Sequence, residues 1–439
     1  MTYTRETFGN IPALSQGLFY ALALASMAVF AWGIWRRFQL WKHGQPIDFR
    51  ALVSGSIRER LEQWKPGLRR VVVEGFGQQR IRGRGLPSWA HASLVAGFLM
   101  LFLGTTLLEV DHLAGMVSEH LKFHRGTYYL IYEFTLDVFG LLFVLGCIGF
   151  GIRRLIRPPS VGHRASDWVV LGLFLGIGLT GYLVEGLRMV WQQPTGLGAA
   201  CSPVGKWVAS GFSGWTESQA RGAHLGVWWL HALLVFGFFA VIPFTRLIHV
   251  VTGPLNLFLT KPALGQLVPI TMEEVEKTER MGVSDIRHFT QAQLLSLDAC
   301  MECGRCEEAC PAFATAKPLS PKKVVQDLKG VMSTLGAPSS ATSPPSVHEV
   351  ISAETLWSCT ACNACAFVCP VRVDPVRLII DMRRHLVAEG GLSGTAAVAL
   401  RRMQSSANPW GLPPADRGLW IQSAMADAGG SQPSPSSSS

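Results

Sequence analysis

Charged residues are scarce in this chain of 439 residues: Asp, Glu, Lys and Arg make up only 16%, whereas hydrophobic residues make up 49%. This balance lies outside the usual range of soluble domains and indicates a membrane protein. The net charge of +9 does not require a nucleic-acid partner, because basic cytoplasmic loops give a membrane protein the same sign. We therefore expect membrane lipid, and no nucleic acid, as a partner.

Catalytic motifs are lacking from the more hydrophilic second half, which has no nucleophile beside a base and no phosphate-binding loop. One stretch, 176–181, matches the letters of a dinucleotide-binding fingerprint. It lies inside an apolar segment with no strand before it, so we reject this match. These absences leave bound cofactors as the source of any chemistry.

Five apolar stretches are long enough to cross a bilayer, whose hydrocarbon core of ~30 Å takes about 20 helical residues. They cover residues 14–35, 89–110, 127–152, 168–190 and 224–250. The first is too long for the apolar core of a signal peptide, and its amino-terminal flank is not basic. We expect a retained helix there and a bundle of five transmembrane helices.

The distribution of Lys and Arg predicts the orientation of these helices. The segment 36–84 carries twelve of them, and four more follow the third stretch, whereas the alternate loops hold few. The amino terminus should therefore lie outside the cytoplasmic (inner) membrane, and everything beyond Arg246 should lie in the cytoplasm. Apolar residues recur at helical spacing between Leu52 and Trp64, beside basic residues. That pattern fits either an amphipathic helix at the membrane surface or a basic tether.

Histidines occur at matching depths in the second and fifth stretches, and an ionisable residue in a membrane segment is a functional hypothesis by default. His91 and His249 lie toward the inner side, and His112 and His231 toward the outer side. A haem iron needs an axial ligand on each face, which facing helices of a bundle can supply. We predict an inner b-type haem on His91 and His249.

An outer b-type haem should use His112 with His231, or with His224 nearer the outer water. The 18 residues from His231 to His249 would span about 27 Å on one helix, which leaves room for two haems. Interfacial histidines with purely structural roles are the alternative. His120 and His124 could replace His112, whereas His43 and His163 are expected to be cytoplasmic loop residues.

Glu185 and Arg188 lie three residues apart at the outer end of the fourth stretch. An ion pair at this spacing beside a haem could hold a quinone or move its protons, and a structural salt bridge is the alternative. Asp137, inside the third stretch, is a second candidate. Gly172 and Gly176 have the spacing of small residues that favours close helix packing in lipid.

Eight of the ten cysteines form two identical runs of the pattern Cys-x2-Cys-x2-Cys-x3-Cys-Pro. The runs are Cys300, Cys303, Cys306, Cys310 and Cys359, Cys362, Cys365, Cys369. This is the bacterial two-cluster ferredoxin pattern, in which the fourth cysteine of each run ligates the other four-iron four-sulfur cluster. Structural zinc would explain the Cys-x2-Cys pairs, but not four cysteines with a trailing proline twice over. Cys147 and Cys201 are expected to be structural.

These features predict a domain order. Residues 1–265 should form the all-α transmembrane domain, 266–390 a small α-helical or α+β ferredoxin-like domain with two clusters, and 391–439 an extension. A helix is expected over 320–332 and a loop insertion over 335–347. The Ser- and Pro-rich tail 429–439 should be disordered.

The order of parts resembles membrane proteins in which a nitrate-reductase-gamma-like cytochrome b domain is fused to a heterodisulfide-reductase-like iron-sulfur domain. The likeness is carried by stretches 228–231, 243–249, 303–306, 317–321, 383–384 and 408–411. It implies electron transfer between the quinone pool and a soluble redox partner, an electron-transferring flavoprotein or a heterodisulfide-reductase-like subunit.

Members of that family usually continue into a cysteine-rich region of the CCG type, whereas this chain ends in a Ser-rich tail soon after Trp420. The site that meets the soluble partner is therefore expected to lie on a separate chain or to be dispensable. We expect a quinone-linked oxidoreductase, or a purely electron-conducting subunit of a larger respiratory complex. A membrane sensor that uses its clusters as a switch is a more distant alternative.

Overall fold

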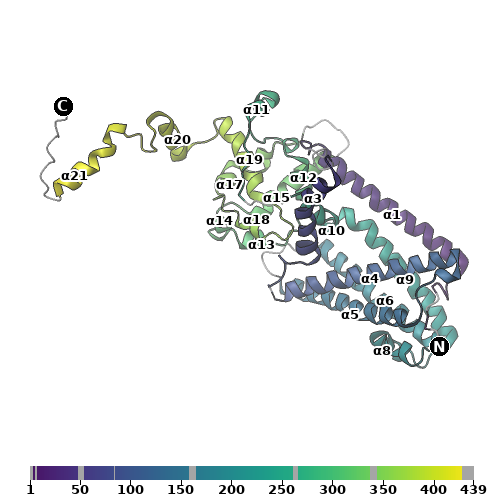
Figure 1. Cartoon of the computed structure of the whole chain (residues 1–439). Helices are drawn as coiled ribbons and strands as arrows, with labels where there is room; N and C mark the ends of the chain where they lie inside the picture. Colours follow the sequence, from purple (N-terminus) through teal and green to yellow (C-terminus); the bar gives the residue numbers. More distant parts are fainter. Residues whose placement is uncertain are drawn as a thin grey trace. The chain divides into compact units, whose positions relative to one another are not determined.

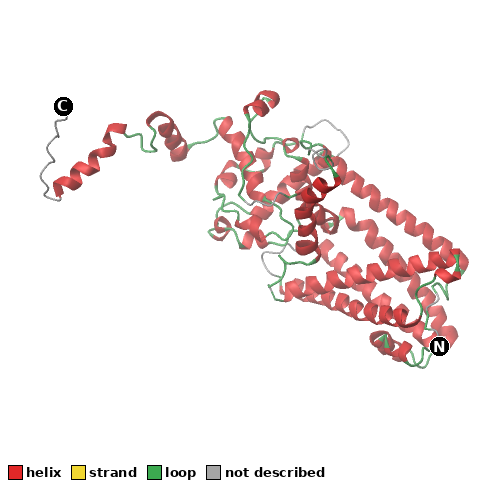
Figure 2. Cartoon of the chain, in the orientation of Figure 1, coloured by secondary structure: helices red, strands yellow, loops and turns green. Residues whose placement is uncertain are grey.

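The computed structural model describes residues 3–4, 7–47, 54–83, 85–157, 165–260, 265–336 and 344–427. Across these residues the chain is helical, and it has two isolated β-bridges but no strand (Figure 2). It divides into two compact units. Unit 1 comprises Met1–Val268 with Ser284–Ile379, and unit 2 comprises Pro269–Val283 with Ile380–Ser439.

Five long apolar helices in unit 1 confirm the predicted number of membrane spans (Figure 1). They are α1 (Ala13–Lys42), α4 (Leu86–Val117), α5 (Gly126–Ile156), α6 (Ala165–Gln192) and α9 (Glu217–Val241). Each is long enough for a bilayer core of ~30 Å at 1.5 Å per residue. Short elements lie between them: η2 (Glu119–Leu121), α7 (Leu197–Ala200) and α8 (Pro203–Ser210).

Helix α4 packs along α5, and α6 along α9, with α1 against α9. Glycines let α4 and α5 approach closely, because a Cβ on Gly97 would lie 2.6 Å from the carbonyl oxygen of Phe139. On Gly146 it would lie 2.6 Å from the amide nitrogen of Leu94. Large apolar side chains fill the middle of the bundle around Phe143, Phe174 and Phe238, and Cys147 is buried there, as expected for a structural residue.

Of the two glycines predicted to pack closely, Gly176 does so, because a Cβ there would lie 3.3 Å from the Leu234 side chain on α9, whereas a Cβ on Gly172 would meet nothing within 4 Å. Closer contacts on α6 are at Gly178, where a Cβ would lie 2.8 Å from the Val144 side chain on α5, and at Gly186, where it would lie 2.6 Å from the Val208 side chain on α8. Small-residue spacing alone does not show which face of a helix is packed, and so it does not distinguish Gly172 from Gly178.

The fifth span ends earlier than predicted. Helix α9 stops at Val241, and two short 3-10 turns, η3 (Ile242–Phe244) and η4 (Arg246–Ile248), lead into α10 (His249–Leu259). Pro243 cannot donate a helical hydrogen bond, and Thr245 is extended and caps the next turn by accepting from the Leu247 amide. The continuous span 224–250 is therefore wrong, since an apolar run does not by itself reveal a break in the helix.

The basic segment after α1 contains helix α3 (Ile57–Arg70), which continues into the π-helical turn η1 (Val71–Phe76). Its start is a capping box of Ser56 and Glu59, and Ile57, Leu61 and Leu68 are exposed along it. Of the two alternatives for this segment, a helix is present, and it begins at Ile57. Leu52 and Val53 lie outside the described residues.

The cysteine runs lie in a group of short helices. These are η5 (Ile286–His288), α12 (Gln291–Ala299), α13 (Arg305–Glu308), α14 (Pro311–Ala314), α15 (Pro321–Thr334), α16 (Val347–Val350), α17 (Ala353–Trp357) and α18 (Ala364–Val368). Helix α15 confirms the helix predicted over 320–332. We refer to residues 284–379 as the cluster domain. Residues 337–343 of the predicted loop, and the predicted tail, lie outside the described residues.

The cluster domain contacts the carboxyl-terminal end of α1 through Asp298. This fully buried carboxylate accepts from the Trp41 indole N–H at 2.9 Å and lies 3.6 Å from Arg37 and 3.1 Å from Lys329. The cluster domain makes a second contact with η1, where Nη2 of Arg372 lies 2.7 Å from Oε1 of Glu74 in an ion pair.

Unit 2 contains α11 (Met272–Thr278), α20 (Gly394–Ser406), η6 (Pro414–Gly418) and α21 (Leu419–Asp427). Helix α19 (Pro375–Ala388) runs from unit 1 into unit 2. Within unit 2 the amide of Val283 donates to the carbonyl of Asp381 at 2.9 Å.

Candidate redox cofactor sites

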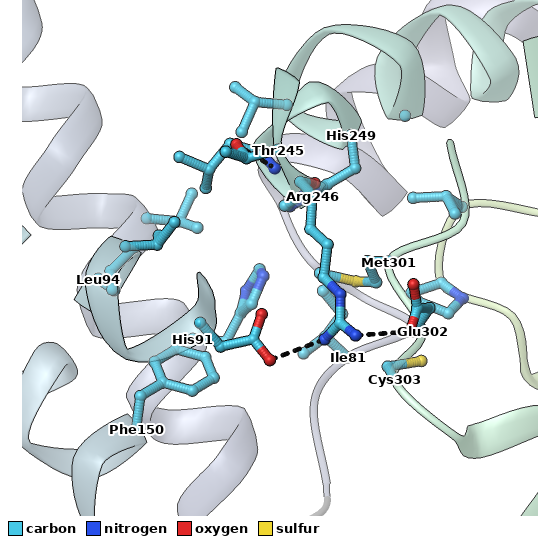
Figure 3. A pocket seen from close by; sticks show the side chains of 18 of the residues that line it. Ile81, His91, Leu94, Phe150, Thr245, Arg246, His249, Met301, Glu302 and Cys303 are labelled. Atoms are coloured by element: carbon cyan, nitrogen blue, oxygen red, sulfur yellow. Dashed lines mark hydrogen bonds and ion pairs between the residues drawn. The ribbon is translucent and has the colours of Figure 1, made fainter. Parts of the chain in front are cut away.

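His91 and His249 line one cavity of about 1010 Å³ (Figure 3). His91 comes from the first turns of α4 and His249 from the first turn of α10. The structure therefore brings the predicted inner pair to one site, although His249 does not belong to the fifth membrane helix. Side chains of Phe98, Phe150 and Phe238 form part of the apolar wall.

Both histidines are held through Nδ1. In His249 this atom lies 2.6 Å from the backbone oxygen of Arg246, and in His91 it lies 2.8 Å from Oε1 of Gln78. An oxygen of this kind only accepts, so Nδ1 carries the hydrogen and Nε2 keeps its lone pair. Metal-binding histidines are typically oriented this way. Burial also lowers the pKa of His249, which favours the neutral form that binds metals.

The polar end of the cavity is rich in arginine. Arg246 lies 3.0 Å from Asp167 and 2.6 Å from Glu302, and Arg154 lies 2.6 Å from Asp167. Guanidinium groups bind carboxylates well, including those of haem propionates. Two neutral imidazoles, an apolar wall and a basic end therefore fit a b-type haem.

The same cavity reaches the first cysteine run, because Met301, Glu302 and Cys303 line it, as does Pro370 beside the last cysteine (Figure 3). The candidate haem site is thus adjacent to the candidate cluster site. Arg305 reinforces this junction by donating to the backbone oxygen of Arg80 at 2.8 Å.

Seven of the eight cysteines lie in two neighbouring groups. Cys300, Cys303, Cys306 and Cys369 line one small hollow, which Cys365 also reaches. Cys365 lies beside Cys359 and Cys310, whose proximity adds to the effect of burial in raising the pKa of its thiol. The fourth cysteine of each run is therefore placed with the other run, which is the exchange that the ferredoxin pattern predicts. Such buried thiols ionise when a metal supplies positive charge.

No group of three or more His, Cys, Asp or Glu side chains in the described part of the chain is arranged to hold a single metal ion. A zinc site would need four ligands within ~2.3 Å of one point. Thiolates around a cubane are spaced more widely, because each binds a different iron. The placement of each run with the fourth cysteine of the other is the arrangement that two clusters would need.

At the other end of the bundle the hydrogen bonds distinguish His231 from His224. The Thr180 hydroxyl donates to the Gly176 carbonyl at 2.6 Å, so it can only accept from Nδ1 of His231, 3.0 Å away. Nε2 of His231 therefore keeps its lone pair. The Asn10 amide donates to the Arg221 carbonyl at 2.8 Å and approaches Nδ1 of His224 at 3.3 Å.

His224 therefore accepts through Nδ1, which places its hydrogen on Nε2 and makes it the poorer metal ligand. His112 lies edge-on to Phe8, with ring centres 5.0 Å apart, and its pairing with His231 stays a prediction. His124 is buried, with Nδ1 3.4 Å from Asp111. His163 lies outside the described residues.

Glu185 and Arg188 form the predicted pair, with Nη2 of Arg188 2.5 Å from Oε1 of Glu185. The same nitrogen lies 2.5 Å from Oε1 of Glu133 on α5. Sequence reasoning missed Glu133, although an acidic residue within an apolar stretch was a signal. Asp137 accepts from the amides of Val204 and Gly205 at 2.9 and 3.0 Å, so it caps the start of α8.

Gln78 was also missed, and nothing in its sequence context could have revealed it. It follows the π-helical turn η1, is buried, and has a left-handed backbone with φ of 52°. Unusual backbone conformations such as this one are common at functional sites, and Gln78 orients the candidate haem ligand His91.

Two family models match the chain. The nitrate reductase gamma subunit matches residues 88–266, and the 4Fe-4S dicluster domain matches residues 296–373. The first covers the helices that hold all four candidate haem ligands, and the second covers all eight cysteines of the two runs. No solved structure matches the chain significantly.

Three curated relatives are informative. The chain is 32% identical to the EtfAB:quinone oxidoreductase of Syntrophomonas wolfei, over 95% of this chain and 61% of that protein. It is 28% identical to the probable iron-sulfur-binding oxidoreductase FadF of Bacillus subtilis, over 84% of this chain and 57% of that protein. It is 24% identical to a subunit of the dihydromethanophenazine:CoB--CoM heterodisulfide reductase of Methanosarcina mazei, over 55% of this chain and 91% of that protein.

The chain thus spans 57–61% of the length of the first two relatives. Four of its apolar helices, α4, α5, α6 and α9, match one family model and its cysteine runs match another, whereas α1 lies outside both matches. The chain therefore contains a region similar to the nitrate reductase gamma subunit, followed by a region similar to the 4Fe-4S dicluster domain, and over 95% of its length it is similar to an EtfAB:quinone oxidoreductase.

Proposed function

We propose that this chain conducts electrons between a soluble redox partner and membrane quinone, as a quinone-linked oxidoreductase or as the conducting subunit of one. The main support for the proposal is that His91, His249 and Cys303 line one cavity. The candidate haem site therefore lies beside the candidate cluster site. When bound, haem and cubane clusters exchange single electrons, whereas quinone exchanges two electrons with two protons.

Different residues of the chain would bind the different cofactors. His91 and His249 would hold an inner haem b, and His112 and His231 an outer one. Cys300, Cys303, Cys306 and Cys369 would hold the cluster next to the cavity, and Cys359, Cys362, Cys365 and Cys310 the second cluster. Cys362 is exposed whereas Cys310 and Cys365 are buried, so the second cluster site is the one open to a partner.

The partner is proposed to be an electron-transferring flavoprotein or a heterodisulfide-reductase-like subunit, which the names of the relatives support. Glu185 and Arg188 are the proposed contact for the quinone head group. The basic loops support a topology with the amino terminus outside and the cluster domain in the cytoplasm.

Flash reduction tests this proposal. The full-length protein in nanodiscs that contain menaquinone-4 is reduced at its clusters by a photoexcited soluble deazaflavin, and haem absorbance is followed. Haem should be reduced and then reoxidised by the quinone. In the His249→Ala protein the first step should fall at least tenfold, whereas His43→Ala, an exposed histidine after α1, should match the parent.

Unchanged haem reduction in the His249→Ala protein would remove the inner site from the path. No haem in the purified parent protein would overturn the proposal and favour a sensor. Quinone-dependent reoxidation by the isolated chain identifies an enzyme, and reoxidation only after a second polypeptide is added identifies a conducting subunit.

A further inference from the structure

A buried carboxylate pair lies between α5 and α6, at the end of the bundle away from the cluster domain. Glu133 and Glu185 both contact Nη2 of Arg188 at 2.5 Å. The side chains of Glu133 and Arg188 are 6% and 8% exposed, and that of Glu185 is 17% exposed. Nη2 of Arg188 therefore serves two carboxylates, while Nε of Arg188 donates to Oε2 of Glu185 at 3.1 Å.

The pair lies well inside its helices. Glu133 follows the first residue of α5, Gly126, by seven positions, and Glu185 precedes the last residue of α6, Gln192, by seven. Seven residues correspond to about 10 Å along a helix. Ionisable groups at such depth are costly, so they mark functional sites by default.

Two carboxylates that meet at one nitrogen repel each other, and in such surroundings one of them takes up a proton. Neighbouring groups act on this proton in both directions. The Tyr129 hydroxyl donates to Glu133, which favours the ionised form of that carboxylate. Asp137, one turn deeper on α5, adds a third carboxylate, which accepts from two backbone amides. The second guanidinium nitrogen, Nη1 of Arg188, is engaged by Gln192 at 2.6 Å.

Other titratable or charged groups lie toward the same end of the elements packed around the pair. They are Glu109, Asp111 and His112 on α4, Tyr128 and Tyr132 on α5, Tyr182 on α6, Lys206 on α8, and Glu217, Arg221, His224 and His231 on α9. Lys206 is exposed, and the Tyr182 hydroxyl donates to the backbone oxygen of Asp137.

The pair is close to the proposed outer haem ligand. A Cβ on Gly181 would lie 3.4 Å from Cε1 of His231, so this face of α6 meets the imidazole. Residues four apart share a helix face, which places Glu185 one turn further out from Gly181. A group that accepts electrons at His231 would therefore have a proton-binding group nearby.

We propose that Glu133 and Glu185 hold one proton between them and exchange it with a quinone bound beside Arg188. The inference rests on the proposed function and adds the proton path to it. Reduction of one quinone to quinol takes two electrons, supplied through the cofactors that the chain holds, and two protons. Each proton passes from the pair to a quinone oxygen, and the pair takes its next proton from the water on that side. Quinol oxidation reverses both flows.

Infrared spectroscopy tests the shared proton without any quinone reaction. At pH 7 the C=O stretch of a protonated carboxylic acid, identified by its shift in D2O, should be present in the full-length protein. Because the proton is shared, both Glu133→Gln and Glu185→Gln should remove the same band. The control is Glu217→Gln, which alters an exposed carboxylate 2.8 Å from Arg221 on α9 and should leave the band in place.

A band that persists in both variants, disappears in only one, or is absent from the parent would overturn the shared proton. Menaquinone-dependent haem reoxidation should fall about 100-fold in either variant, as for loss of a general acid or base. Light-driven transfer from clusters to haem should stay unchanged. A parent protein that shows the band but never reacts with quinone would refute the proposed function and leave the proton pair standing.

Discussion

Nδ1 of three histidines, His91, His231 and His249, lies next to an oxygen that can only accept. The sequence could locate these residues, because an imidazole in or beside an apolar segment stands out. It could not tell His231 from His224, since that choice depends on partners 51 and 214 positions away along the chain, Thr180 and Asn10.

Gln78 is expected to matter for the inner haem although it would not touch the iron. Gln78→Ala removes the acceptor that orients His91, and loss of such an outer-shell partner usually weakens metal binding about 10- to 100-fold. Haemin titration of the haem-depleted protein should show that loss at one of two sites. Gln79→Ala, which changes an exposed neighbour, is the matched control. Equal haem affinity in both variants would contradict the role of Gln78.

The outer ligand is tested by a pair of substitutions on one helix. His231→Ala should remove about half of the b-type signal in reduced-minus-oxidised spectra, because one of two proposed haems loses its ligand. His224→Ala should retain the full signal, since its Nε2 carries the hydrogen. The opposite result would reassign the outer haem to His224, and a full signal in His249→Ala would refute the inner pair.

At the scale of elements, the five membrane helices could be predicted because length and hydropathy determine them. The break after α9 could not, because Pro243 and Thr245 lie in an apolar run and the turn depends on a cap at Thr245. The exchange of the fourth cysteines was readable from the cysteine spacing. Glu133 was overlooked because its partner, Arg188, lies on a different helix.

The junction between α1 and the cluster domain should depend on Asp298. Asp298→Ala leaves Arg37 and Lys329 without their buried partner, and breaking such a group costs about 3–5 kcal/mol. Thermal unfolding followed by cluster absorbance should begin at a lower temperature than in the parent. Glu62→Gln is the control, because it removes the charge of an exposed carboxylate that lies 3.6 Å from Lys65. It should leave the unfolding temperature unchanged. Equal stability of the two variants would show that Asp298 does not hold the junction.

For the whole molecule, the eight cysteines and two histidine pairs predict eight cluster irons per chain plus one or two haem irons. Elemental analysis of the purified protein, with haem determined separately, gives both numbers. Zinc in place of iron would end the ferredoxin interpretation.

Topology can be measured independently of the cofactors. The bias of Lys and Arg predicts that a cytoplasm-active reporter fused after Thr260 is active, and that the same reporter at Gly211 is inactive. Activity at Gly211 would contradict the proposed orientation, while leaving the five helices in place.

The break between α9 and α10 means that His231 and His249 do not lie on one rigid helix. His231 belongs to a membrane helix, whereas His249 starts a helix that packs on α3 and α12 and is capped by Arg70 through the carbonyls of Leu257 and Thr260. Membrane helices tilt to match the hydrocarbon thickness around them. In thin or thick lipid the spacing between the two haem positions should therefore change, while the spacing between His249 and Cys303 stays constant. Lipid chain length would then tune electron transfer between the two proposed haem sites and leave the step between the proposed clusters and His249 untouched.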